Sequence, residues 1–423
     1  MRLSCSLRTI GPMGLLVSMA LRNLVRHRRR TMLTMLSIAV GLAVLLWLQC
    51  LIAGRNENMI STITSTYTGH LQVADHEYRK SHLTSKTFVP IENAALTPFT
   101  GRYETAQRIH LPALASSGED SVPLMLEGIE PENEAKITRL KSSLTRGEYL
   151  TEGDYTDCAN KEIYVGESLA AILKVDLGQK LVILAQANDG TLGNELLRVK
   201  GIFSTGSPDF DKSFAFTHKS CVQSIGALQG IHELVIGLDS SRLEGEMTAA
   251  LTTGLPVNLR VTTWREAMPA VATMIRYNDA SFKMITVVLF SVIALGVINT
   301  LLMSVFERLK EFGVMIALGT RPFQLQSLVL LECFFVAIFS SALGTVFGSI
   351  AVFYHRQVGF DLTPFLGEQT GAGGFSFDLI IHPIFELVPF LKLVGIIVAL
   401  IMCAGLVPAF RASRLDPVEV MRS

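Results

Sequence analysis

The stretch from Thr31 to Ala53, TMLTMLSIAVGLAVLLWLQCLIA, contains no charged residue and follows directly on Arg28-Arg29-Arg30. The hydrocarbon core of a bilayer is about 30 Å thick, so a helix needs roughly 20 apolar residues to cross it. A secretory signal has an apolar region of only about 7–15 residues and ends at a small-residue cleavage site, which is absent here. The stretch therefore predicts a retained transmembrane helix at residues 31–53.

Three further apolar runs follow along the chain. They are residues 284–306, residues 323–354, whose one charged residue is Glu332, and residues 387–410. The whole chain is 49% hydrophobic and only 17% charged, with a mean hydropathy of +0.40, which is outside the usual range of soluble domains. We predict a membrane protein with four transmembrane helices and a large segment, residues 54–283, inserted between spans one and two.

The positions of the basic residues predict the orientation of the spans. Lys and Arg gather before span one, between spans two and three, and after span four: Arg22, Arg26, Arg28, Arg29, Arg30, Arg308, Lys310, Arg321, Arg411, Arg414 and Arg422. Short loops rich in Lys and Arg stay in the cytoplasm. We therefore expect residues 1–30, 307–322 and 411–423 to be cytoplasmic, and residues 54–283 and 355–386 to lie outside. The chain is then a multi-pass protein of the inner (plasma) membrane with both termini in the cytoplasm.

The N-terminal segment has a pattern of its own. Residues 13–30 alternate apolar side chains, such as Leu16 and Met19, with basic ones, such as Arg22 and Arg26, at helical spacing. This pattern indicates either an amphipathic helix on an anionic inner leaflet or simply a basic flank. Translation could begin at Met13 or Met19 instead of Met1.

The large outer segment is predicted to be a mixed α+β domain. Short runs typical of strands are His70–Val73, Val122–Leu126, Lys180–Leu184, Leu196–Lys200 and Leu234–Leu238, and runs typical of helices are Glu167–Leu173 and Ser241–Leu251. Asn188-Asp189-Gly190 is a hairpin signal between two of these strands. Apolar residues share one face of residues 56–67 and of residues 264–282, which we interpret as helical stalks joining the domain to spans one and two.

The cysteines do not indicate a metal or redox site. The chain has six, and none is in a C-x-x-C pair or at zinc-binding spacing. Cys158 and Cys221 share the outer segment and could form a disulfide in an oxidising compartment. We expect instead that both are buried, reduced thiols.

No catalytic motif is present in the sequence. There is no G-x-x-x-x-G-K-S/T phosphate loop, no H-E-x-x-H and no G-x-S-x-G. His232-Glu233 lacks a second His, so we interpret it as a surface pair at a strand edge. Gly371-Ala372-Gly373-Gly374 follows no strand and opens no helix, which favours a flexible loop over a phosphate site. We expect no catalytic residue, no cofactor or metal in this chain, and, with a formal net charge of zero, no nucleic-acid partner.

Residues 307–322 form the most informative loop. Leu309, Phe312, Ile316 and Leu318 alternate with charged side chains, which predicts a short amphipathic helix with these apolar residues against the inner face of the membrane. Gly319 and Pro322 then supply a stop signal. On physical grounds the helix is either a docking element for a cytoplasmic partner or a plain interfacial connector.

Glu332 is the one acidic residue in the predicted spans. An ionisable group inside a span is costly and is therefore a candidate for a function. It lies near the cytoplasmic end of span three, where it could reach the interface or anchor a hydrogen bond between helices. We favour a structural role.

Several motifs resemble those of the FtsX-like permeases, the membrane subunits of ABC transporters that include macrolide-exporter and lipoprotein-releasing permeases. The motifs are Ala20–Leu24, Thr68–Val73, Gly128–Glu132, Tyr164–Ala170, Val199–Phe203, Glu307–Gly313 with Ala317–Gly319, and Pro408–Pro417. Glu307–Gly313 is similar to the family's coupling helix, and Glu332 falls where the family has a Glu early in span three. Residues 69–73 and 207–211 favour the lipoprotein-releasing branch.

The resemblance implies a permease subunit that is not itself an enzyme. A separate cytoplasmic ABC ATPase dimer would bind ATP and magnesium and push on the coupling helix, and the stalks would carry this motion outward (mechanotransmission). The implied coupling residues are Glu307, Arg308, Lys310, Glu311, Phe312, Gly313, Ala317 and Gly319. The implied partners are that ATPase, a second permease subunit, identical or paralogous, and a lipoprotein substrate. Efflux of drugs or peptides, and regulation of a cell-wall hydrolase, are the alternatives.

Overall fold

The computed structural model describes residues 12–26, 28–90, 94–118, 120–151, 158–240, 243–366, 371–372 and 374–413. These residues form two compact units. The first contains residues up to Asn56, Tyr277–Leu362 and the chain from Ile380 onward, and the second contains Glu57–Arg276 and Thr363–Leu379. Some residues at the two ends of the chain, Arg414 and Arg422 included, lie outside the described part.

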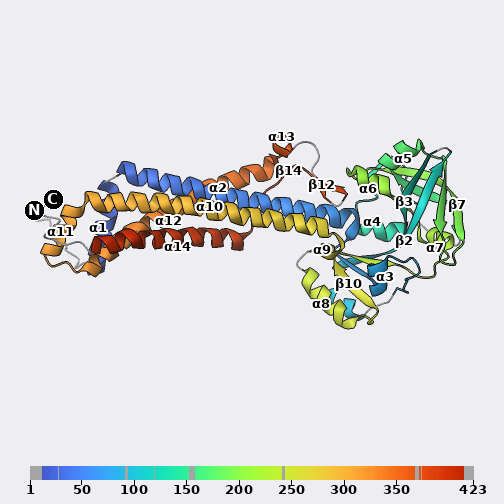
Figure 1. The fold of residues 1–423 in the computed structure, drawn as a ribbon, viewed down its shortest axis with the longest axis horizontal. Helices are drawn as coiled ribbons and strands as arrows, with labels where there is room; N and C mark the ends of the chain where they lie inside the picture. Colours follow the sequence, from blue (N-terminus) through green and yellow to red (C-terminus); the bar gives the residue numbers. More distant parts are fainter. Residues whose placement is uncertain are drawn as a thin grey trace, which may run out of the picture. The chain divides into compact units, whose positions relative to one another are not determined.

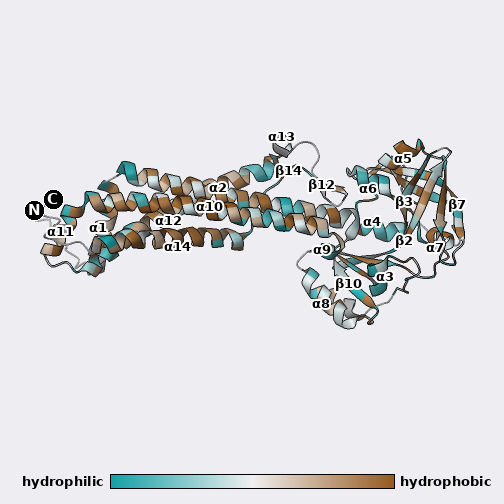
Figure 2. Ribbon diagram, viewed as in Figure 1, coloured by the Kyte–Doolittle hydropathy of each residue, from teal (hydrophilic) through white to brown (hydrophobic). Residues whose placement is uncertain are grey.

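The first unit is a bundle of helices (Figure 1). Its members are α1 (Pro12–Arg26), α2 (Arg28–Ile63), α10 (Pro269–Glu307), α11 (Leu309–Ala317), α12 (Pro322–Val358) and α14 (Leu387–Ser413). Four segments of the described chain are long and apolar enough to cross a membrane: Arg28–Thr68, Pro269–Glu307, Pro322–Val358 and Leu387–Ala412. Figure 2 shows hydrophobic residues running along α10, α12 and α14.

Glycines allow the long helices of the bundle to approach closely. A Cβ atom on Gly344 of α12 would lie 2.8 Å from the carbonyl oxygen of Ala39 in α2, and one on Gly348 would lie 3.2 Å from Leu46 Cβ. Gly344 and Gly348 are four residues apart and so share one face of α12. Small residues at this spacing let transmembrane helices pack backbone to backbone. Such close packing is important in a membrane, because lipid supplies no hydrophobic force that would drive helices together. The contact between α2 and α12 therefore depends on these two positions.

The second unit is built on one ten-stranded sheet, in the order β10-β1-β9-β2-β3-β8-β5-β7-β4, with β6 pairing with β2 and β7. The strands are β1 (Leu71–Asp75), β2 (Tyr103–Ser117), β3 (Asp120–Ile129), β4 (Leu144–Gly147), β5 (Glu162–Gly166), β6 (Lys180–Gln186), β7 (Leu192–Phe203), β8 (Phe214–His218), β9 (Glu233–Leu238) and β10 (Leu259–Thr263). The β3–β8 and β5–β7 pairs are parallel and the others are antiparallel. The mixed α+β prediction is confirmed for this unit.

Helices cover this sheet. They are α3 (His76–Ser81), α4 (Pro131–Ile137), α5 (Glu167–Leu173), α6 (Pro208–Ser213), α7 (Lys219–Gly226), α8 (Glu244–Gly254) and α9 (Trp264–Ala267), with the short turns η1 (Thr64–Thr68) and η2 (Ala94–Phe99). The predicted hairpin at Asn188–Gly190 is confirmed, since β6 and β7 pair from Lys180↔Arg198 to Gln186↔Leu192.

The two stalk segments pack into the second unit but are not continuous α-helices. Met59 and Ile63 share a buried cluster with Trp264, Val271 and aromatic residues of the sheet. A π-helical turn, η1, ends the first segment. The second breaks at Met268, which has φ −123° and ψ 70°, because the residue before a proline, here Pro269, avoids the helical conformation.

Three further predictions about residues outside the long helices are wrong. Cys158 and Cys221 form a disulfide instead of remaining reduced; they are 63 residues apart in sequence, and only the fold brings them together. His232 and Glu233 are buried in the sheet, not exposed at a strand edge. Gly371–Ala372 (β12) pairs with Phe375–Ser376 (β13), and Phe375 packs in the core of the second unit, so this part is an ordered ladder. Gly373 itself lies outside the described residues.

The remaining short elements belong to the same stretch between α12 and α14. Phe360–Asp361 (β11) pairs with Ile380–Ile381 (β14) in the first unit, and α13 (Thr363–Leu366) is in the second. Residues 355–386 therefore hold structure from both units.

Candidate functional site

Charged side chains meet at the end of the bundle where α1 and α11 lie (Figure 1). Arg308 is the single residue between α10 and α11, and its backbone, at φ −108° and ψ 13°, departs from helical geometry. Its side chain is almost fully buried, with 7% of the residue exposed. The break between the two helices thus turns a charged side chain of the predicted coupling loop into the protein.

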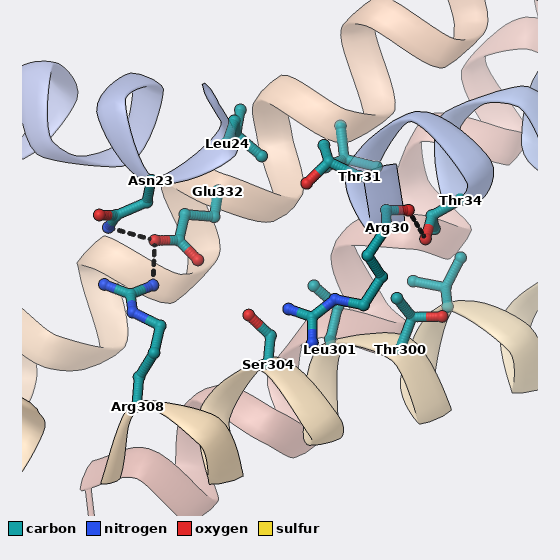
Figure 3. Close-up of a pocket in the computed structure, with 12 residues that line it drawn as sticks. Asn23, Leu24, Arg30, Thr31, Thr34, Thr300, Leu301, Ser304, Arg308 and Glu332 are labelled. Atoms are coloured by element: carbon teal, nitrogen blue, oxygen red, sulfur yellow. Dashed lines mark hydrogen bonds and ion pairs between the residues drawn. The ribbon is translucent and has the colours of Figure 1, made fainter. Parts of the chain in front are cut away.

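Glu332 of α12 is the partner of Arg308. Arg308 Nη1 donates to Glu332 Oε1 at 2.8 Å, and Asn23 Nδ2 of α1 donates to the same oxygen at 2.6 Å. Figure 3 shows both side chains pointing at this carboxylate. Of the two roles considered for Glu332, the geometry corresponds to a hydrogen-bonded anchor between helices.

The environment of this ion pair explains how two charges are tolerated there. Taking an ion out of water costs several kcal/mol in practice, and only close pairing with further hydrogen bonds offsets that cost. Arg308 has additional partners, since its Nε donates to Glu311 Oε2 at 3.2 Å and its guanidinium lies 5.0 Å from the centre of the Phe312 ring. The Arg308–Glu332 pair is neutral overall, and its bonds fix α1, α11 and α12 against one another.

Two further ion pairs, both at the surface, lie around this buried pair. Arg26 of α1 pairs with Glu311 of α11 at 2.9 Å, and Arg30 of α2 pairs with Glu307 at the end of α10 at 2.6 Å. Exposed pairs of this kind contribute only about 0–1 kcal/mol each. They help to orient the helices relative to one another, while the buried pair has the larger effect on the stability of this contact.

A small cavity of about 40 Å³ lies beside the buried pair, and its lining includes Asn23, Arg30, Thr34, Thr300, Ser304, Arg308 and Glu332. This volume suits one or two water molecules, which the polar groups among these residues can hold. It is too small for a nucleotide or a transported molecule. Among the described residues, no group of His, Cys, Asp and Glu is arranged to hold a metal ion.

Two family models match the chain. The model for the MacB-like periplasmic core domain matches residues 31–253, which is more than half of the chain, and the model for the FtsX-like permease C-terminal region matches residues 283–417. The chain belongs to the family of FtsX-like permeases with a MacB-like periplasmic core domain.

Individual relatives are distant. The lipoprotein-releasing system transmembrane protein LolC of Xylella fastidiosa strain Temecula1 is 21% identical over 318 residues, covering 72% of this chain and 74% of the relative. The macrolide export ATP-binding/permease protein MacB of Shewanella sp. strain ANA-3 is 24% identical, covering 96% of this chain but only 60% of the relative. The crystal structure of the periplasmic region of MacB from Actinobacillus actinomycetemcomitans has 16% identity over 51% of this chain and 94% of that one, with a TM-score of 0.34.

In this permease the predicted coupling residues fall into two groups. Glu307, Lys310, Glu311, Ala317 and Gly319 are exposed, whereas Arg308, Phe312 and Gly313 are buried. Phe312 packs in a cluster with Ala20, Leu325 and Leu328, so the buried group holds α11 in place and offers no surface to a partner. The ends of α11 agree with the stop signals, since Gly319 has φ +93° and Pro322 opens α12.

The outer face of α11 is more apolar than the sequence pattern indicated. Lys310, Val314, Ala317 and Leu318 are spaced so that they share one side of the helix, and all four are exposed. Leu318 is 82% exposed and Val314 is 51% exposed. We had placed Leu318 on the side facing the membrane. The helical period predicts which residues share a face of α11. It does not predict which of its two apolar faces, that of Phe312 or that of Val314, packs against the other helices.

Sequence reasoning also missed the role of Asn23. It stands in the basic segment 13–30, where we considered only apolar and basic side chains. An amide in such a segment can bond a buried carboxylate without adding charge. Its position in the Ala20–Leu24 motif was the available signal.

Proposed function

We propose that this permease is the membrane-spanning subunit of an ABC transporter in the inner membrane, with α1, α11 and both termini in the cytoplasm and residues 54–283 outside. The arginines of α1, of the α10–α12 connection and of the end of α14 support this orientation by the positive-inside rule. ATP and magnesium would be bound by a separate ABC ATPase dimer, because the chain has no phosphate loop.

The exposed face of α11 carries this proposal. Val314 and Leu318 expose apolar surface beside Lys310, and the cytoplasm is an unfavourable environment for such a pair of side chains unless a partner covers them. Interfaces place apolar anchors of this kind in pockets of the partner and surround them with charged residues. Lys310, Glu307 and Glu311 are the charged residues around these anchors.

The buried Arg308–Glu332 pair would link movement of α11, when the ATPase contacts it, to movement of the other helices. Arg308 is covalently joined to α10 and α11 and bonded to α12 through Glu332, so α11 is not free to move by itself. α2 and α10 each continue as one helix from residues of the first unit into residues of the second. A push on α11 would therefore be passed along the helices as a mechanical signal, without a conducting path.

We further propose that the transported substrate is a lipoprotein released from the inner membrane. The similarity to lipoprotein-releasing transmembrane proteins and the stretches 69–73 and 207–211 support this class. Export of drugs or peptides is the second candidate, since the exporter aligns over 96% of this chain.

We also propose that α10 contacts a second permease subunit. The most apolar part of α10 is only 6% buried, against 39–44% for the corresponding parts of the other three long helices, so its surface is available for such a contact.

The ATPase assignment is tested by purifying the tagged chain from its own host and measuring ATP hydrolysis. We expect the wild type to co-purify with an ATPase, and the chain stripped of that partner to hydrolyse no ATP. Leu318→Asp should reduce the bound ATPase at least about tenfold, because the anchor is lost, while Leu391→Asn, at an exposed position of α14, should not. Turnover by the stripped chain, or unchanged ATPase recovery with Leu318→Asp in an inserted, folded protein, would contradict the proposal.

A further inference from the structure

A second buried charge cluster lies in the other unit, far in sequence from the coupling loop. It surrounds a cavity of about 180 Å³ whose lining includes Tyr67, Gln72, Arg79, His110, Glu127 and Glu233. These residues come from η1, β1, α3, β2, β3 and β9. The cluster belongs entirely to residues 57–276, the second unit.

His110 is at its centre and is in contact with two carboxylates. His110 Nδ1 lies 2.6 Å from Glu127 Oε2, and Nε2 lies 3.2 Å from Glu233 Oε2. A carboxylate accepts hydrogen bonds, so each ring nitrogen needs its own N–H to bond it. With both carboxylates ionised, only the doubly protonated imidazolium satisfies both contacts.

The charges around His110 agree with a protonated ring. The titratable or charged groups that face it or its partners are Tyr67 of η1, Tyr78 and Arg79 of α3, Arg108 of β2, Glu127 of β3, Glu134 of α4, Glu233 of β9 and His232, which precedes β9. Arg108 and Glu134 form their own pair through two bonds, of 2.6 and 3.1 Å. With His110 charged, three cations (Arg79, Arg108 and His110) match three carboxylates (Glu127, Glu134 and Glu233).

Two chains of hydrogen bonds connect His110 to η1. In the first, Glu127 accepts from the Tyr67 hydroxyl at 2.8 Å. In the second, Glu233 accepts from Arg79 at 2.7 Å, Arg79 donates to Gln72 at 2.5 Å, and Gln72 donates to the Thr68 carbonyl at 3.0 Å. Both chains end on the last two residues of the π-helical turn.

The π-helical turn is the element that such bonds would have to hold. π-helices are rare and occur mostly as single turns, frequently at functional sites. η1 lies between α2 and β1, and it is closed by Gly69 at φ +61°, whose N–H bonds the Thr64 carbonyl. A Cβ atom at Gly69 would lie 3.0 Å from the Ile236 carbonyl oxygen, so the turn sits directly against β9.

We propose that protonated His110 is a lock that holds this π turn, and with it the end of α2, against the sheet, and that loss of the His110 proton releases Tyr67 and Thr68. Deprotonation leaves one carboxylate without its donor, which frees Glu127 or Glu233 from its fixed position. The hydrogen-bond chains through Tyr67 and Arg79 then lose their common support.

The pKa values of the two neighbouring histidines distinguish their roles. Burial lowers the pKa of His110, but Glu127 and Glu233 outweigh burial and raise it to about 9. Burial lowers the pKa of His232 to about 4, so His232 is neutral, and its Nδ1 accepts from the His110 backbone N–H at 3.0 Å. Because the folded-state pKa of His110 is above its ordinary value, the stability that the charged ring contributes is fully present below about pH 6.5 and is lost as the pH rises through about 9.

Hydrogen–deuterium exchange of the full-length protein in lipid nanodiscs tests the lock without any ATPase or substrate. After correction for intrinsic exchange, we expect wild-type peptides covering residues 64–72 to lose about tenfold of their protection between about pH 7 and pH 10. Tyr67→Phe should show faster exchange in this segment already at about pH 7, and a smaller pH response. Tyr164→Phe is the matched control, because its hydroxyl bonds the Leu140 carbonyl outside the cluster.

Equal wild-type protection of residues 64–72 at both pH values would overturn the proposal. So would unchanged protection of that segment in Tyr67→Phe when the rest of the sheet exchanges as in the wild type. Since the readout involves only this unit, it is independent of whether the transporter assignment holds.

Discussion

Arg308 and Glu332 place two opposite charges where each is shielded from water. The effect of replacing one of them therefore depends on whether the other is still present. Their side chains are 8% and 9% exposed, and Asn23 donates a further bond to the carboxylate. Replacing such a pair together by apolar residues can be nearly neutral, whereas removing one partner leaves an uncompensated buried charge. The asymmetry makes the pair experimentally distinguishable from a surface contact.

A double-mutant cycle measures this asymmetry. Arg308→Met or Glu332→Met alone should destabilise the folded protein by about 3–5 kcal/mol, and the double variant should cost clearly less than the sum. Arg260→Met and Glu266→Met form the matched control pair at the surface, because both side chains are exposed and lie outside this site, with an expected cost of about 0–1 kcal/mol. The measurement is the free energy of unfolding of the purified permease in mixed micelles. Additive costs at Arg308 and Glu332 would show that the pair is not coupled as the geometry indicates.

At the scale of elements, the sequence was sufficient to predict those features that depend on residues close together in the chain. Asn188-Asp189-Gly190 specifies a hairpin, Gly319 and Pro322 delimit α11, and uncharged runs mark the long helices. Orientation and pairing depend on residues that meet only in the fold. No pattern around His232 shows that β9 is an inner strand lying beside β1 and β2, or that α11 turns Arg308 inward to reach Glu332.

The Cys158–Cys221 disulfide is a long-range constraint of this kind. With a sequence separation of 63 residues, chain-entropy arguments assign it about 4 kcal/mol of stability. Cys158→Ser should therefore lower the midpoint of thermal unfolding, and dithiothreitol should lower that of the wild type but not of the variant. Thiol alkylation under denaturing conditions without reductant checks the bond directly. Alkylation of both cysteines in protein taken from the membrane would contradict this assignment of the disulfide.

At the scale of the whole molecule, the permease has equal numbers of acidic and basic residues, 37 of each, yet their distribution is uneven. Arginine gathers on the side of the bundle that holds α1 and α11, and the described residues there leave Val314 and Leu318 uncovered. The second unit buries its own charges around His110 instead. The central claim is that the uncovered face of α11 receives the ATPase, and that the buried ion pair beside it transmits the load.

Site-specific photo-cross-linking tests that claim most directly. A benzophenone amino acid at Leu318 should form an adduct with an ABC ATPase in living cells, identified by mass spectrometry of the cross-linked band. The same probe at Leu295, an exposed residue of α10, should give no such adduct. Absence of an ATPase adduct from Leu318 in a correctly inserted permease, or an equal yield from Leu295, would contradict the account.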